Sequence, residues 1–145
     1  MINFFALDEH RRLVDLPGYG YAKVPESMQK HWRLGLQNYV LQRQSLCGLV
    51  LVLDIRQGLT ELDWLMVDHC INAGVALHCL LTKADKLSRN QANAALMQCS
   101  RKLEEAGVEA SLQDFSSLKA QGVEDAHSVL DEWLGYESAV AAAPA

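Results

Sequence analysis

Asp85 is the side chain with the most specific chemistry in this sequence. It closes the tetrapeptide Thr82-Lys83-Ala84-Asp85, which follows an apolar run. An ionised carboxylate can accept two adjacent donors at once, and guanine presents such a pair in its N1–H and N2 amino groups, whereas adenine does not. The Lys83 stem can lie along the base while its ammonium reaches acceptors near the phosphates. We therefore expect a guanine site here; the competing interpretation is the cap region of the helix that follows.

A second candidate is Asp15-Leu16-Pro17-Gly18, which also follows an apolar run. The Asp15 carboxylate could hold Mg²⁺ through water, and Gly18 could bring a backbone N–H close to a terminal phosphate. Taken alone, the pattern is explained more simply by a strand that ends in a Pro-Gly turn.

The third candidate is Phe115-Ser116-Ser117, which follows a weaker strand-like run. A small residue at this place would let a backbone N–H approach the guanine O6 atom. Two serines after a strand are also ordinary loop residues. Three such segments at successive strand ends, in one order, indicate a nucleotide site much more strongly than any one of them.

The elements that must position these residues alternate along the chain. The expected strands are 2–7, 12–16, 48–54, 75–81 and 109–115, and the expected helices are 25–44, 60–74, 88–106 and 123–134. Capping boxes at 60–63 and 88–91 mark two of the helix starts. This order predicts an α/β fold with a parallel sheet and helices on both faces, whose ligands bind beyond the carboxyl ends of the strands.

The composition fits a single globular domain. The chain has 145 residues, of which 50% are hydrophobic and 21% are charged. The longest apolar run, 49–53, is far shorter than the roughly 18 residues of a membrane span, so no membrane partner is expected. With 13 basic and 18 acidic residues the net charge is −5, whereas proteins that wrap nucleic acid are usually basic. The four cysteines lack metal-site spacing, which favours reduced thiols in a cytoplasmic protein.

With these segments in place, the chain resembles the EngB family (also called YihA or YsxC) of Ras-like P-loop GTPases. Residues 15–22 are similar to the family's magnesium and γ-phosphate motif, and 82–86 and 115–117 are similar to its two base-recognition segments. Asp54-Ile55-Arg56, followed by Thr60, Asp63 and Met66, is similar to a further signature. The Asp54–Arg56 pair is equally well interpreted as a local ion pair or as part of a partner-binding surface.

The resemblance implies GTP/GDP binding, dependence on Mg²⁺, and a role in assembly of the large ribosomal subunit. It also implies a link to cell division and septation, a cytoplasmic location and a monomeric state. Tyr19 stands where many Ras-like proteins have the Gln that orients the attacking water, so any GTP hydrolysis should be slow. The implied nucleotide-binding residues are Asp15, Leu16, Pro17, Gly18, Thr82, Lys83, Ala84, Asp85, Phe115, Ser116 and Ser117, with Asp15 also contacting Mg²⁺ through water.

The phosphate loop of the family, Gly-x-x-x-x-Gly-Lys-Ser/Thr, does not occur in this sequence. We therefore expect an N-terminally truncated G domain over 1–135, which lacks the family's first strand and phosphate loop, and a flexible tail over 136–145. Strands 12–16 and 48–54 would lose their shared neighbour, which predicts a gap or distorted pairing between them. Nucleotide binding should be poor. The alternative function is a ribosome-interaction module that keeps the scaffold but does not hydrolyse GTP.

Overall fold

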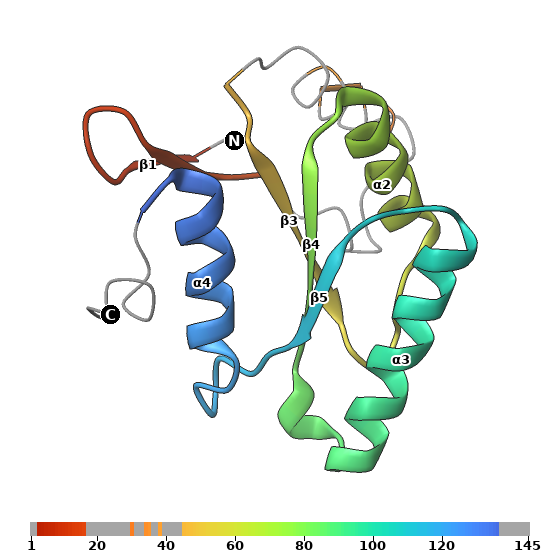
Figure 1. The fold of residues 1–145 in the computed structure, drawn as a ribbon. Coiled ribbons are helices and arrows are strands. Elements are labelled where there is room, and N and C mark those ends of the chain that lie inside the picture. The colour runs from red at the N-terminus through yellow and green to blue at the C-terminus, as the bar shows by residue number, and fades with distance from the viewer. Residues whose placement is uncertain (1–2, 17–29, 31–33, 36–37, 39–44, 137–145) are drawn as a thin grey trace, which may run out of the picture.

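The computed structural model describes residues 3–16, 30, 34–35, 38 and 45–136 (Figure 1). Strands β1 (Asn3–Ala6) and β2 (Arg12–Asp15) form an antiparallel hairpin. Strands β3 (Gly48–Asp54), β4 (Ala76–Thr82) and β5 (Ser111–Asp114) form a separate parallel sheet in the order β3-β4-β5. The expected parallel sheet is therefore present.

Four helical segments follow β3 or lie between and after the later strands. They are α2 (Glu61–Ala73), the 3₁₀ turn η1 (Ala84–Lys86), α3 (Arg89–Glu105) and α4 (Val123–Leu134). Helices α2 and α3 cover one face of the parallel sheet and α4 lies on the other (Figure 1). This confirms the α/β class with helices on both faces. None of the helices in the described ranges combines the length and the apolar character needed to cross a membrane.

Local signals in the sequence set the helix boundaries. At α2 the Thr60 side chain accepts a hydrogen bond from the Asp63 amide, and Asp63 accepts one from the Thr60 amide. Ser88 and Gln91 form the same capping box at α3. Each box gives partners to amides that the first helical turn leaves without acceptors. Gly74 ends α2 in the left-handed region at φ 67°, where a residue without Cβ is not strained.

The hydrophobic core lies between the parallel sheet and helices α2 and α3. Strand β4 contributes Cys79 and Leu81, which are fully buried. Burial raises the pKa of the Cys79 thiol to about 12, so this cysteine is an inert apolar side chain. The remaining core residues are Leu51, Leu53, Ile55, Met66, Val67, Cys70, Leu77, Ala84, Ala92, Cys99, Leu103 and Val108.

The opposite face of the sheet packs on α4. His78 of β4 is buried, and its ring nitrogens contact the Ser111 hydroxyl at 2.6 Å and the Gln113 side-chain oxygen at 2.9 Å. The Trp133 ring meets the His78 ring edge-on, with centroids 6.4 Å apart. Trp133 also lies directly against Gly48, where a Cβ would stand 2.4 Å from its ring. Close packing of α4 on β3 thus requires glycine at position 48.

Among the described residues, the hairpin and the parallel sheet are separate sheets with no strand pairing between them. Strand β3 pairs with β4, and no strand among the described residues pairs with its other edge. This confirms the gap expected between strands 12–16 and 48–54. Leu16, immediately after β2, packs against the core and gives the hairpin an apolar contact with the body.

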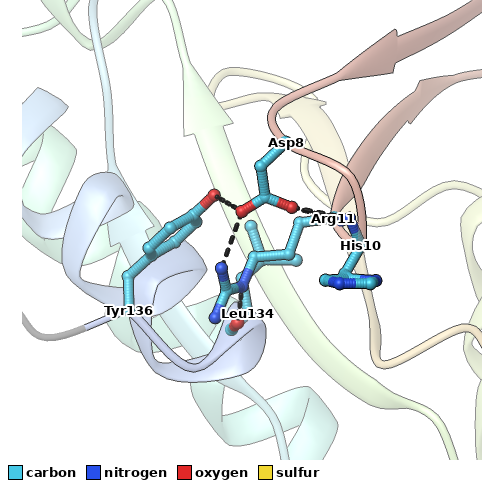
Figure 2. Close-up of polar contacts among 5 residues, drawn as sticks. All are labelled: Asp8, His10, Arg11, Leu134 and Tyr136. Carbon is cyan, nitrogen blue, oxygen red and sulfur yellow. Dashed lines mark hydrogen bonds and ion pairs between the residues drawn. The ribbon is translucent and has the colours of Figure 1, made fainter.

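A polar network joins the hairpin turn to the end of α4 (Figure 2). Arg11 donates from Nε to the Leu134 carbonyl and from Nη1 to the Asp8 carboxylate, the latter at 2.7 Å. Its guanidinium also lies 4.1 Å from the ring centroid of Tyr136, whose hydroxyl donates to Asp8. Hydrogen bonds from the His10 amide, Tyr136 and Arg11 hold the pKa of Asp8 well below its usual range. Arg11 therefore connects segments that lie more than a hundred positions apart.

Two expected segments lie largely outside the described residues. Lys30, Leu34, Gly35 and Asn38 are helical, as expected for 25–44, and the rest of that segment is not described. Tyr136 is the first residue of the expected tail, and 137–145 are not described. The domain boundary at 135 therefore stays a prediction.

Candidate functional site

The first segment of the candidate site begins where β4 ends beside β3. Asp54 and Thr82 are partners in the parallel ladder, and the Ile55 amide donates to the Thr82 carbonyl at 3.0 Å. The Thr82 hydroxyl donates to the Leu53 carbonyl at 2.7 Å. Thr82 is therefore bound on both its backbone and its side chain by β3, which fixes the start of the Thr82–Asp85 tetrapeptide.

The chain then turns sharply at Lys83. This residue adopts the left-handed conformation at φ 62°, which is uncommon for a residue with a Cβ. Turn η1 follows, with Ala84 buried in the core. The Ala84 amide donates to the Phe115 carbonyl at 3.0 Å, and the Phe115 amide donates to the Leu81 carbonyl at 2.8 Å. These bonds extend the β4–β5 pairing beyond the strand ends and bring the first and third candidate segments together.

Asp85 and Ser116 meet at this edge, although they are 31 positions apart. The Ser116 hydroxyl donates to Asp85 Oδ1 at 2.7 Å and accepts from the Lys119 amide at 3.2 Å. The Ser116 backbone exchanges two hydrogen bonds with Gln121, at 3.0 and 2.9 Å. Ser116 is completely buried, so its hydroxyl has a single fixed orientation toward the carboxylate.

The electrostatics of this edge keep Asp85 ionised. The hydrogen bond from Ser116 is the main cause that lowers the pKa of Asp85, and the positive charges of Lys86 and Lys119 add to it. Ser116 occupies one lone pair of one oxygen, and a carboxylate has about four acceptor positions. Asp85 is half-buried, so the remaining acceptor capacity is accessible to a ligand. The arrangement can bind a ligand that offers neighbouring N–H donors.

The structure brings together the two segments predicted to contact the base. Ser117 lies beside them with an exposed side chain. Thr82 and Ala84 act here through hydrogen bonds and packing that shape the turn. Their predicted contact with a nucleotide stays a prediction.

The segment predicted to contact phosphate and metal is described only in part. Asp15 is exposed at the end of β2, and Leu16 is half-buried against the core. Pro17 and Gly18 lie outside the described residues. Within the described ranges, no group of three or more His, Cys, Asp or Glu side chains is placed to hold a metal ion. The role predicted for Asp15 at a metal ion therefore stays a prediction.

Two contributions to the site were not predicted from the sequence. Gln121 supports Ser116 through both backbone groups, and the Asp54 carboxylate lies 3.5 Å from the Lys83 ammonium. Gln121 stands in a loop with no recognisable pattern. The position of Asp54 at the end of a buried strand could have indicated a site residue. Its sequence separation from Lys83, however, carries no information about their contact.

Several curated proteins with similar sequences carry the same name. A probable GTP-binding protein EngB from Methylobacillus flagellatus is 54% identical over 134 residues, which cover 92% of this chain and 65% of that protein. The corresponding protein from Nitrosococcus oceani is 49% identical over 135 residues, covering 93% of this chain and 68% of the relative. This chain thus spans about two thirds of the length of these relatives. No family model matches the sequence.

Solved structures support the same fold. The crystal structure of a probable GTP-binding protein EngB superposes with a TM-score of 0.76 at 15% identity, covering 93% of this chain and 84% of that one. The elongation factor SelB from Methanococcus maripaludis, solved with the GTP analogue GppNHp, gives a TM-score of 0.68 at 18% identity over 92% of this chain and 28% of that one. At such low identity these structures support the fold alone. The sequence relationships carry the assignment further: the chain belongs to the EngB family of GTP-binding proteins.

Proposed function

We propose that this chain carries the base-recognition part of an EngB-type GTP-binding protein, with GTP and GDP as its ligands. The observation that supports this most directly is the hydrogen bond from the buried Ser116 hydroxyl to Asp85, at the carboxyl ends of β4 and β5. Parallel sheets of this kind bind their ligands at that edge.

Asp85 would recognise guanine through its ionised carboxylate. The N1–H and N2 amino groups of guanine donate side by side to a carboxylate, whereas adenine would leave the carboxylate unpaired and facing an acceptor. The Ser116 amide is already bonded to Gln121. We therefore assign the contact with guanine O6 to the neighbouring backbone N–H of Ser117. Lys83 would lie along the base or ribose.

The test is base selectivity, measured by titrating the chain with GDP, ADP and XDP and following amide NMR signals of residues 82–85 and 115–117. We expect weak binding, since the sequence has no phosphate loop, with GDP preferred over ADP by at least about tenfold. Asp85→Asn should move the preference toward XDP, because its amide can donate to the C2 oxygen of xanthine. Asp68→Asn, an equal charge change at an exposed position of α2, is the control.

Two outcomes would count against parts of this proposal. Equal binding of GDP and ADP would refute guanine recognition. Micromolar affinity for GDP by isothermal titration would refute the expectation of poor binding, while leaving the base selectivity in place.

The wider role that we propose follows from family membership. The protein would act in large-ribosomal-subunit assembly in the cytoplasm, with a link to cell division, as a monomeric and slow GTPase. Asp15 would hold Mg²⁺ through water, and the ion would offset phosphate charge. Co-sedimentation with purified large subunits in the presence of GTP, GDP or no nucleotide tests the partner. If equal amounts of protein bound the subunits in all three conditions, the result would instead favour an interaction module that does not hydrolyse GTP.

A further inference from the structure

A second carboxylate lies beside the candidate base site. Asp54 is the last residue of β3 and the ladder partner of Thr82, which places it next to the backbone of Lys83. Its side chain is 15% exposed. The Asp54 carboxylate is therefore close enough to interact directly with side chains of the Thr82–Asp85 tetrapeptide.

The orientation of the Asp54 carboxylate is set by Arg56. The Arg56 guanidinium donates from Nε to Oδ1 at 3.0 Å and from Nη2 to Oδ2 at 2.8 Å, and its backbone amide donates to Oδ1 at 2.9 Å. Three hydrogen bonds from one residue, two of them a planar bidentate pair, hold the carboxylate in a single rotamer.

The oriented carboxylate faces the ammonium group of Lys83. Nζ of Lys83 lies 3.5 Å from Oδ2 of Asp54, the same oxygen that accepts from Nη2 of Arg56. One negative charge therefore lies near two positive charges, so the Asp54 carboxylate attracts the Lys83 ammonium without fully neutralising it. The hydrogen bond to Asp54 raises the pKa of Arg56, and the negative charge of Asp85 adds to this effect. Both carboxylates therefore lie at the same edge of the sheet and both influence Arg56.

We propose that Asp54 is a positioning residue for Lys83. Fixed by Arg56, the Asp54 carboxylate holds the Lys83 side chain at the nucleotide site, where its stem can lie along the base or ribose and its ammonium can reach acceptors near the phosphates. This rests on the proposed function. Lys83 is 58% exposed and has a long flexible stem, so ordering it on binding would cost conformational entropy. An ammonium held beforehand by Asp54 loses less of that entropy when the nucleotide binds.

A double-mutant cycle on the full chain tests the coupling. GDP affinity is measured for the unmodified chain, Asp54→Asn, Lys83→Ala and the double variant, with Asp68→Asn as the matched charge control. We expect Asp54→Asn to weaken GDP binding roughly three- to fivefold when Lys83 is present and to have no further effect once Lys83 is removed. An equal loss in both backgrounds would overturn the proposal, because a merely structural role does not depend on the lysine side chain.

A second readout needs no nucleotide. The Cε–Hε NMR signal of Lys83 in the free chain should shift in Asp54→Asn and stay in place in Asp68→Asn. If the unmodified chain failed to distinguish GDP from ADP, guanine recognition would be refuted, and this signal alone would decide whether Asp54 holds Lys83. An unchanged Lys83 signal in Asp54→Asn would overturn the positioning role.

Discussion

The two regions of the molecule that carry candidate site residues are built in different ways. The edge proposed for base recognition (the base-recognition edge, residues 82–85 and 115–117) continues the hydrogen-bonding of a buried parallel sheet, and its central hydroxyl, on Ser116, is completely buried. The β1–β2 hairpin, which ends at Asp15, has exposed side chains on most of its residues and meets the body through Leu16 and the Arg11 network. The first region is preorganised by the fold, whereas the second depends on a few local contacts.

The largest expected effect is on the base-recognition edge. Gly122 has a φ of +82°, and a Cβ there would stand 2.5 Å from the Asp114 carbonyl oxygen. Gly122→Ala should lower the free energy of unfolding by about 3 kcal/mol, combining backbone strain with a clash against backbone. Gly74→Ala, with φ +67° and open space, should cost only about 1 kcal/mol. Urea unfolding measures both; equal losses would show that the loop after β5 is not closely packed.

Hydrogen exchange compares the two regions directly. Amides of Leu51, Cys79 and Leu81 should exchange at least about a hundredfold more slowly than those of Phe5 and Leu13, which form a hydrogen-bonded pair of the hairpin ladder. The reason is that the β3–β4 ladder is buried, whereas the hairpin has little apolar cover and can open without the core. Equal protection across both sheets would mean that the hairpin unfolds only with the whole chain.

Ser116→Ala should raise the pKa of Asp85 toward its ordinary value, because the principal hydrogen bond to the carboxylate is lost. The folded-state pKa of Asp85 lies below that of the unfolded chain, so its ionised form stabilises the fold above about pH 4 and this contribution disappears as the pH falls through the folded-state value. The variant should therefore lose stability relative to the unmodified chain near neutral pH and much less in acid. A carbon NMR titration of the Asp85 carboxyl measures the shift.

The control for this titration is Ser117→Ala, since Ser117 is the exposed neighbour. Its Asp85 titration should match that of the unmodified chain. If both variants moved the pKa equally, the cause would be a general change of the loop and not the Ser116 hydroxyl.

The smallest effect is expected for the hairpin network. Arg11→Ala removes the contacts with Leu134, Asp8 and Tyr136 and should speed hydrogen exchange in β1 and β2 severalfold, with little change in the β3–β4 amides. Arg12→Ala removes a neighbouring exposed arginine and serves as control. If Arg11→Ala left hairpin exchange unchanged, Leu16 alone would account for the docking.

Much of the fold could be predicted because its signals are local. Strand β3 is a continuous run of β-branched and aliphatic residues, and α4 has an amphipathic period. Both elements begin and end in the structure where the sequence predicts. The capping boxes at Thr60 and Ser88 are likewise complete within four residues. Strand β5 was harder: the prediction covered 109–115, but pairing with β4 limits it to Ser111–Asp114.

The sequence by itself determined the residue types at the strand ends, and with them the guanine chemistry expected of Asp85, because a carboxylate needs no neighbour to have two acceptor oxygens. It also determined the alternation of elements that puts those ends at one edge. Only the tertiary structure decided that Ser116 orients Asp85, that Asp54 faces Lys83, and that Arg11 joins the hairpin to α4. These contacts join residues 29 or more positions apart, and their formation depends on strand register and packing, which no local spacing encodes.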